Sequence, residues 1–346
     1  AQMALNGPFR IAKTGNYIAD VSADMNLLSL TGTADIDLQT LAFERNALQP
    51  KDLSERLRGF FNAATGSFGG RADFLITNGQ VSGKGRFNIS DLYLETVRLG
   101  PVFGINGDIV FDDLIGLSTP PGQTVTIDRV NPGVLLQNGV LKFQVIEGRE
   151  ARLESAVWPF AGGELSVKPT LWTIAGKTDT IEVRADRVEL KDLIETLKVP
   201  NLDATGTVSG VFPIELRAGA TYINDARFAV DEQGGRLSYT GQTLSNAGGS
   251  DQMVNEAFRA LQNLQYSVLE LRLNGNLLGD ITLGALILGK NPDVLGGSEF
   301  EFDIALDSKL AQLLQTGREA ATQGRLAEIV ASRVEGQTAA PDTPQD

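Results

Sequence analysis

The sequence predicts a mainly β protein, built as one long antiparallel β-sheet with a few short helices. Alternating apolar and polar residues recur along the chain, Asn-Gly pairs lie between or beside these runs, and helical periodicity is confined to a few short segments. Successive side chains of a strand point to opposite faces of a sheet, so each alternating run has one apolar and one polar face. Such runs joined by tight turns are typical of antiparallel sheets.

The clearest alternating run covers residues 202–216. Fully extended, it would span roughly 50 Å at about 3.3 Å per residue, which is longer than a common strand. Pro213 and the glycines can interrupt it, because proline has no N–H and glycine has no side chain to pack. Its apolar or small face carries Leu202, Ala204, Gly206, Val208, Gly210, Phe212, Ile214 and Leu216.

Further segments repeat this alternation and predict a meander of amphipathic strands. Asn-Gly pairs at 78–79, 106–107, 138–139 and 274–275 are predicted to form hairpin turns, since both residues readily adopt the positive φ of a two-residue turn. The apolar positions of these strands are Ala72, Phe74 and Ile76; Val81, Gly83, Gly85, Phe87 and Ile89; Ile181, Val183 and Ala185; Ala226, Phe228 and Val230; Leu269, Leu271 and Leu273; and Phe300, Phe302, Ile304 and Leu306.

Helical spacing is found in three places. Pro50–Phe61 and a helix capped by Ser250 are interpreted as lids or plugs, and a third helix is predicted after Asp307 or Ser308. Residues 317–334 are predicted to continue the third helix, and residues 337–346 to be disordered. The apolar stripes are Leu53, Leu57, Phe60 and Phe61; Val254, Ala257, Phe258, Leu261 and Leu264; and Leu310, Leu313 and Leu314.

Composition excludes several classes of function. The chain has 30 Lys and Arg against 43 Asp and Glu, and the resulting formal charge of −13 disfavours nucleic acid as a partner. It contains neither His nor Cys, which removes imidazole catalysis and thiolate or imidazole metal sites. Adjacent carboxylates such as Asp112 and Asp113 point to opposite faces of a strand and do not form a glycosidase pair. We predict no enzyme activity, no cofactor and no metal.

Aromatic and glycine motifs are interpreted structurally. Residues 158–163 (Trp-Pro-Phe-Ala-Gly-Gly) form either a ligand platform or a kinked strand packed in the core, and the usual burial of aromatic residues favours the core. Gly176-Lys177-Thr178 resembles the end of a phosphate-binding loop, but the upstream glycine position holds Leu171 and no helical pattern follows. A charged hairpin turn is the preferred interpretation there.

No targeting or membrane segment is predicted. The chain has no stretch of eighteen or more apolar residues, and its first residues lack the basic and apolar regions of a signal peptide. The protein is therefore expected either to be soluble or to have lost an N-terminal anchor. Because strand-like alternation begins already at residues 7–10, a fragment of a longer protein is favoured.

Several motifs, taken together and in order, resemble one family. They are residues 104–111 (GINGDIVF), 119–123 (TPPGQ), 131–134 (NPGV), 156–163 (AVWPFAGG), 206–214 (GTVSGVFPI) and 288–292 (LGKNP). Over residues 66–314 the chain resembles the YdbH branch of the AsmA-like intermembrane phospholipid-transport proteins. Each motif alone has low specificity, whereas their order is specific.

This resemblance implies a periplasmic protein, anchored in the inner membrane, whose body curls into a taco-like sheet with a hydrophobic interior and reaches towards the outer membrane. The chain would be its C-terminal part, with residues 1–316 as one continuous groove segment and residues 317–346 as helix and tail. It departs from the family pattern in lacking the anchor and the long N-terminal stretch. The implied ligand is phospholipid, and the implied partner is a small outer-membrane lipoprotein.

The apolar strand faces are the candidate lipid-binding surface. An alternating pattern describes a filled β-sandwich core as well as an open groove, and the resemblance favours the groove. The predicted lining residues are Leu202, Val208, Phe212, Ile214, Leu216, Val81, Phe87, Ile89, Leu269, Leu271 and Leu273.

The last predicted strand is a candidate edge for a partner strand, formed by Phe300, Phe302, Ile304 and Leu306. No later strand pattern follows it, and exposed edges invite strand addition. Coverage of this edge by an earlier strand, or by the helix after Ser308, is equally compatible with the sequence. The main alternative function is a scaffold with a filled core and an open edge. A carbohydrate-active β-helix is disfavoured, because its site needs several convergent carboxylates.

Overall fold

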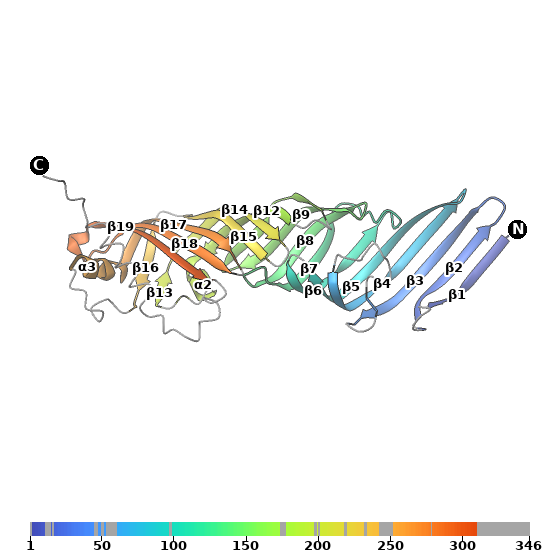
Figure 1. Cartoon of the computed structure of the whole chain (residues 1–346), viewed down its shortest axis with the longest axis horizontal. Helices are drawn as coiled ribbons and strands as arrows, with labels where there is room; N and C mark the ends of the chain where they lie inside the picture. The colour runs from blue at the N-terminus through green and yellow to red at the C-terminus, as the bar shows by residue number, and fades with distance from the viewer. Residues whose placement is uncertain are drawn as a thin grey trace, which may run out of the picture. The chain divides into compact units, whose positions relative to one another are not determined.

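A computed structural model describes residues 2–10, 15, 17–44, 48–49, 52, 61–96, 99–173, 178–196, 199, 201–217, 220–231, 234–241, 252–277 and 279–309. Over these residues the protein is mainly β, with 19 strands in one antiparallel sheet that does not close on itself (Figure 1). The helices named are α2 (Leu190–Thr196), α3 (Gln252–Leu261) and the short 3-10 turn η3 (Leu295–Gly297). The predicted fold class is confirmed.

The chain divides into two compact units. The first comprises Ala1–Pro159, Ser166–Ile181 and Leu216–Ala220, and the second comprises Phe160–Leu165, Glu182–Glu215 and Thr221–Asp346. The single continuous groove segment over residues 1–316 stays a prediction.

Eight strands lie wholly in the first unit before its boundary: β1 (Gln2–Arg10), β2 (Tyr17–Asn26), β3 (Thr31–Phe43), β4 (Phe61–Thr77), β5 (Gln80–Thr96), β6 (Gly100–Phe111), β7 (Gln123–Val130) and β8 (Leu136–Ile146). β11 (Thr170–Thr173) also lies in the first unit. Five strands have residues in both units: β9 (Glu150–Phe160), β10 (Gly163–Val167), β12 (Thr178–Glu189), β14 (Thr207–Arg217) and β15 (Ala220–Val230). The second unit contains all of β13 (Leu202–Ala204), β16 (Gly235–Tyr239), β17 (Leu264–Asn276), β18 (Asp280–Lys290) and β19 (Glu299–Lys309).

Strand pairing follows a simple meander in the first unit, where each strand from β1 to β8 pairs antiparallel with the next. In the second unit β15 pairs with β17, β17 with β18, and β18 with β19. The short strands β13 and β16 pair with each other, and β16 also pairs with β17.

A row of aromatic rings crosses four strands of the first unit. Phe43 on β3, Phe68 on β4, Phe87 on β5 and Phe111 on β6 have neighbouring ring centroids 6.2, 5.0 and 5.8 Å apart. Cross-strand aromatic pairs of this kind stabilise a sheet beyond their area burial. We call the side of the sheet that carries this row, and its counterpart in the second unit, the apolar face.

Glycine makes room for these rings. A Cβ atom on Gly83 would lie 2.6 Å from the ring of Phe74, and one on Gly85 would lie 2.8 Å from the ring of Phe87. Both glycines occupy apolar-face positions of β5, as the alternation predicts. Glycine at 83 and 85 therefore has a packing role within the strand.

A β-bulge at Asp91 keeps the apolar residues of β5 on one face. Before the bulge Phe87 is buried, and after it Leu92 is buried, so the inward positions change from odd to even numbers. Asp91 has φ of 49°, and its N–H donates to Oδ1 of Asn106 on β6 at 2.8 Å. The extra residue shifts the phase of the strand without turning its apolar side chains outward.

The same device occurs in two strands of the second unit. Arg187 in β12 has φ of 51°, and its N–H donates to Oγ of Ser209 on β14 at 2.9 Å. Asp225 in β15 has φ of 49°, and its N–H donates to Oδ1 of Asn274 on β17 at 3.3 Å. In each case a side chain of the neighbouring strand satisfies a backbone donor that the ladder leaves unpaired.

The predicted hairpin role of the Asn-Gly pairs is correct for one pair and wrong for three. Asn78 and Gly79 have φ of 51° and 77° and form the turn between β4 and β5. The pairs at 106–107, 138–139 and 274–275 lie inside β6, β8 and β17. Positive φ and an Asn side chain are useful at bulges as well as at turns, and two of these three asparagines accept the bulge hydrogen bonds.

The run at 202–216 has the predicted alternation but is not one strand. It divides after Ala204, and Gly206 has φ of 109°. The buried Tyr266 hydroxyl donates to the carbonyl of Thr205, and the Thr205 N–H donates to the carbonyl of Arg236 at 2.9 Å. Burial raises the pKa of Tyr266. β13 consequently pairs with β16, while β14 continues separately.

Helix α3 confirms the helix predicted after Ser250, although Leu264 begins β17 instead of extending the helical stripe. The cap predicted at Asp307 or Ser308 is wrong, because both residues lie in β19 opposite Thr282 and Ile281. Cross-strand pairing outweighs the local capping signal there. The predicted helix at 50–61 falls outside the described residues except for residues 52 and 61, as do residues 310–346 entirely.

Trp158 lies in the core, as the favoured interpretation of its motif predicts. It is buried on β9, and a Cβ atom on Gly139 would lie 2.0 Å from its indole Nε1. Glycine at 139 therefore lets the indole ring cross β8 closely.

We predict that Asn106→Ala destabilises the protein by about 1–2 kcal/mol, because it leaves the Asp91 N–H without its acceptor. Asn106→Asp retains an acceptor oxygen and should lose less. Urea unfolding measures the difference. Asn88→Ala is the control, since its bond to Asp108 is exposed, and its effect should stay within about 0.5 kcal/mol. Equal losses for Asn106→Ala and Asn88→Ala would contradict a specific role at the bulge.

We predict that Gly139→Ala costs about 1–3 kcal/mol of unfolding free energy through overpacking against Trp158. The fluorescence of Trp158, measured in a Trp172→Phe background, should change as the indole moves. Gly7→Ala is the matched control, because a Cβ there meets nothing within 4 Å. A Gly139→Ala variant with unchanged stability and emission would show that the indole does not depend on this contact.

Candidate lipid-binding face

The apolar face of the second unit is built from rows of side chains that cross neighbouring strands. One row begins at Phe228 on β15, which lies opposite Leu271 on β17. Leu271 lies opposite Ala285 on β18, and Ala285 lies opposite Ile304 on β19. The Phe212 ring extends the row into β14, with its centroid 5.1 Å from that of Phe228. The row is apolar at every position.

Two more rows run beside it. In one, Leu273 lies opposite Ala226 and Leu283. In the other, Leu269 lies opposite Ile287, which in turn lies opposite Phe302. The structure thus brings the predicted lining residues of β17 and the predicted edge residues of β19 onto one face, although their sequence patterns predicted two separate sites.

Burial differs between these rows. Leu269, Ile287 and Phe302 are buried, whereas Leu271, Leu273 and Ile304 are only partly buried. Side chains in the first set are already covered by protein, and those in the second set retain surface that another molecule can contact.

The remaining predicted lining residues fall into three classes of burial. Val81 is 49% exposed, because it is the second residue of β5 and lies next to a turn. Leu202, Ile214 and Ile89 are partly buried. Val208, Phe212, Leu216 and Phe87 are buried. Their role in lining a groove stays a prediction.

Ion pairs on the opposite, polar face are exposed. Arg71 on β4 contacts Asp73 at 3.2 Å and Asp35 at 3.5 Å, and these hydrogen bonds raise the pKa of its guanidinium. In the second unit Arg227 contacts Asp225 at 3.0 Å. Exposed pairs of this kind contribute little to stability. They mark the polar face as the one that meets water.

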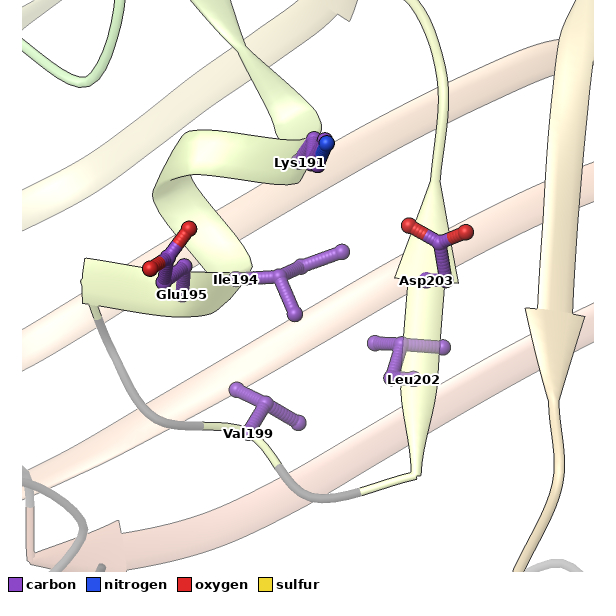
Figure 2. Close-up of a pocket in the computed structure, with 6 residues that line it drawn as sticks. All are labelled: Lys191, Ile194, Glu195, Val199, Leu202 and Asp203. Carbon is purple, nitrogen blue, oxygen red and sulfur yellow. The ribbon is translucent and has the colours of Figure 1, made fainter.

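A pocket of about 400 Å³ lies between α2 and β13 (Figure 2). Ile194, Val199 and Leu202 form its apolar part, and Lys191, Glu195 and Asp203 supply charges. Helix α2 is held in place by the Leu190 N–H, which donates to the carbonyl of Gly206 at 3.0 Å. Leu202 is thus a lining residue of a small mixed pocket.

Buried polar side chains support turns and helix ends. Gln49 mimics a neighbouring strand: its amide nitrogen donates to the carbonyl of Ala64, and its carbonyl accepts from the N–H of Ala64, both at 2.9 Å. The Asn291 amide donates to the carbonyls of Arg259 and Ala260 at the end of α3, at 3.0 and 3.2 Å. Sequence reasoning assigned no role to these side chains.

The motif at 119–123 has the same kind of role. The buried Thr119 hydroxyl accepts from the Val145 N–H at 2.8 Å, and the buried Gln123 side chain accepts from the Val110 N–H at 2.8 Å. These bonds join the loop before β7 to its two neighbouring strands. In the sequence, the signal for both roles was a polar residue within one of the motifs that carry the family resemblance.

Other kinds of site have no support among the residues that the structure describes. No group of three or more Asp or Glu side chains there is arranged to hold a metal ion. Within the same residues, no helix combines the length and the apolar character needed to cross a bilayer.

Comparison with known proteins gives one match. The family model described as "YdbH-like: Intermembrane phospholipid transport protein YdbH" matches residues 5–322. No curated protein and no solved structure matches the chain. The family match covers most of the sequence, and it extends the resemblance at 66–314 in both directions. The chain therefore belongs to the YdbH-like family of intermembrane phospholipid transport proteins.

Proposed function

We propose that the chain carries phospholipid along its apolar face, as the C-terminal segment of a periplasmic bridge between the inner and outer membranes. The observation that carries this proposal is the set of partly buried apolar rows across β15, β17, β18 and β19, centred on Leu271 and Leu273. Membership of an intermembrane phospholipid transport family supports it. In the full-length protein an N-terminal anchor would hold the bridge in the inner membrane.

The mechanism requires only apolar surface. Moving an acyl chain through water costs about 0.8 kcal/mol per exposed methylene, which amounts to tens of kcal/mol for two chains. Neighbouring apolar rows let each methylene exchange one apolar contact for another. The barrier between successive positions is then small, and no nucleophile, acid or base is needed.

A scaffold with a filled core is the alternative. It shares the fold and the apolar alternation, and it differs in having no space for an acyl chain beside Leu271 and Leu273. Mass spectrometry of an organic extract from the purified chain separates the two functions, because a lipid carrier retains phospholipid and a filled core does not.

We predict that Leu271→Asp leaves the protein folded but removes most of its bound phospholipid, since a partly exposed position tolerates a carboxylate that an acyl chain does not. Val208→Asp should instead unfold it, because Val208 is only 1% exposed and an unpaired buried charge is strongly destabilising. Circular dichroism and lipid mass spectrometry of both variants give the comparison.

Gln265→Asp is the matched control on β17, because the Gln265 side chain is exposed and alternates with the buried Leu264 and Tyr266. It should retain both fold and lipid. Cooperative unfolding of Leu271→Asp would favour the filled core, and unchanged lipid content in a folded Leu271→Asp variant would exclude this row as the lipid path.

We further propose that β19 accepts a strand from a small outer-membrane lipoprotein. Its residues Glu299–Lys309 pair with β18 along their whole length, and a strand added on the other side would extend the row that ends at Ile304. Proline cannot donate to a ladder. Glu301→Pro removes a backbone donor and disturbs the ladder on whichever side of β19 that donor serves, so it is expected to weaken lipoprotein capture in a pull-down. Capture at full strength by a folded Glu301→Pro variant would exclude strand addition at this edge.

A further inference from the structure

Two hairpin tips lie side by side at one edge of the first unit. In an antiparallel meander alternate turns share an edge, which places the β2–β3 turn beside the β4–β5 turn (Figure 1). The backbone confirms it, because the Gly79 N–H donates to the carbonyl of Leu30 at 3.0 Å. We call residues 25–34 and 74–83, which include both turns, the uncharged edge.

The uncharged edge contains no Asp, Glu, Lys or Arg, in a chain with 21% charged residues. Charges begin immediately outside it. Asp35 lies opposite Asp73, and Asp73 lies opposite Lys84, so they form a line across β3, β4 and β5. At about 3.3 Å per residue, the strands extend roughly 15 Å beyond this line without a charge.

Large aliphatic side chains on this edge face water. Leu27, Leu28, Leu30, Leu75 and Val81 have exposed fractions from 46% to 85%. They come from both faces of the strands, because Val81 shares the parity of the apolar face of β5 and Leu75 lies on the other side of β4. Exposed apolar side chains gathered in one place mark an interaction surface.

The backbone at Leu30 is strained. Its φ is 51°, in the left-handed region where Gly or Asn is the less strained choice. The side chain is nevertheless exposed, so it adds little to the core. A strained leucine that contributes little to folding is consistent with a role outside the fold.

We propose that the uncharged edge inserts into the interfacial layer of a phospholipid bilayer. The surface is a pair of projecting turns, and it has no charge that would lose its hydration on insertion. Hydroxyl and amide side chains that can bond to headgroups lie between the aliphatic ones, namely Asn26, Ser29, Thr31, Thr77, Asn78 and Gln80. Insertion to about 5–10 Å would place the flanking charges in water.

This inference deepens the proposed function, because a phospholipid carrier has to exchange lipid with a bilayer. Val81, at the tip, belongs to the same strand face as Gly83 and Phe87, so the edge is continuous with the apolar face of the first unit. An acyl chain leaving the bilayer would meet aliphatic side chains before reaching the aromatic row. Asp24, Asp35 and Asp73 outnumber Lys84 around the edge, which favours zwitterionic over anionic surfaces.

The test is flotation of the purified chain with phosphatidylcholine vesicles and with vesicles containing phosphatidylglycerol. The wild-type chain should float with both, and more with the first. Leu28→Asp should reduce vesicle affinity about tenfold or more, given the apolar surface lost from the bilayer. Leu135→Asp is the matched control, because Leu135 is also 52% exposed but precedes β8 at the other edge.

Leu30→Gly separates binding from folding. It removes the side chain and relieves the left-handed backbone, so stability should hold or rise while vesicle affinity falls. The proposal is overturned if the wild-type chain floats with neither vesicle, or if Leu135→Asp weakens flotation as much as Leu28→Asp. It is also overturned if Leu28→Asp and Leu30→Gly bind vesicles normally and lose only the binding of a protein partner. Lipid mass spectrometry on the same samples distinguishes this proposal from the proposed function. If the chain floats with vesicles but contains no lipid, only the proposed phospholipid transport is overturned. If the chain contains lipid but does not float, only the insertion of the uncharged edge is overturned.

Discussion

The structure depends on keeping apolar side chains on one face of strands that are unusually long. β4 and β5 each have 17 residues, and strands of this length twist and bend. A single error of register would turn every following apolar residue towards water. The bulges at Asp91, Arg187 and Asp225 accommodate the bend. At each bulge the buried positions of the strand change from odd-numbered to even-numbered residues. The aromatic row of the first unit and the rows around Leu271 in the second exist only because this phase is maintained.

The motifs that carry the family resemblance support this architecture, because their polar side chains bond to backbone groups of neighbouring elements. Asn106 accepts a bulge N–H, Thr119 and Gln123 join a loop to two strands, and Asn291 caps the end of α3. The Asn131 side chain accepts the Gly133 N–H at 3.0 Å within the turn after β7. Polar residues at turns, bulges and helix ends cannot be exchanged freely, because a buried backbone group would lose its partner. Their spacing can therefore identify the family through structural roles alone.

Much of the fold could be predicted from the residues alone, because a strand face follows from local alternation. At 202–216 the residues predicted to face inward are buried or partly buried, except Gly206 at the break, which is exposed. The break at Gly206, the bulges and the strand at Asp307 could not be predicted, because each depends on a partner distant in sequence. Tyr266 for the break and Asn274 for one bulge are examples. The candidate site shows the same limit: Leu271 and Ile304 were both predicted apolar, but only the register places them in one row.

The unequal burial along the apolar face has a physical consequence for lipid carriage. Side chains such as Val208 and Leu269, at 1% and 3% exposed, already have protein neighbours and contribute their burial to stability. An acyl chain gains nothing from them unless the protein opens. Leu271, Leu273 and Ile304 retain accessible surface, so covering them with an acyl chain removes apolar area from water on both molecules. The apolar face of the second unit can therefore stabilise the fold through its buried positions and bind lipid through its partly exposed ones, and the two properties can be changed separately by substitution.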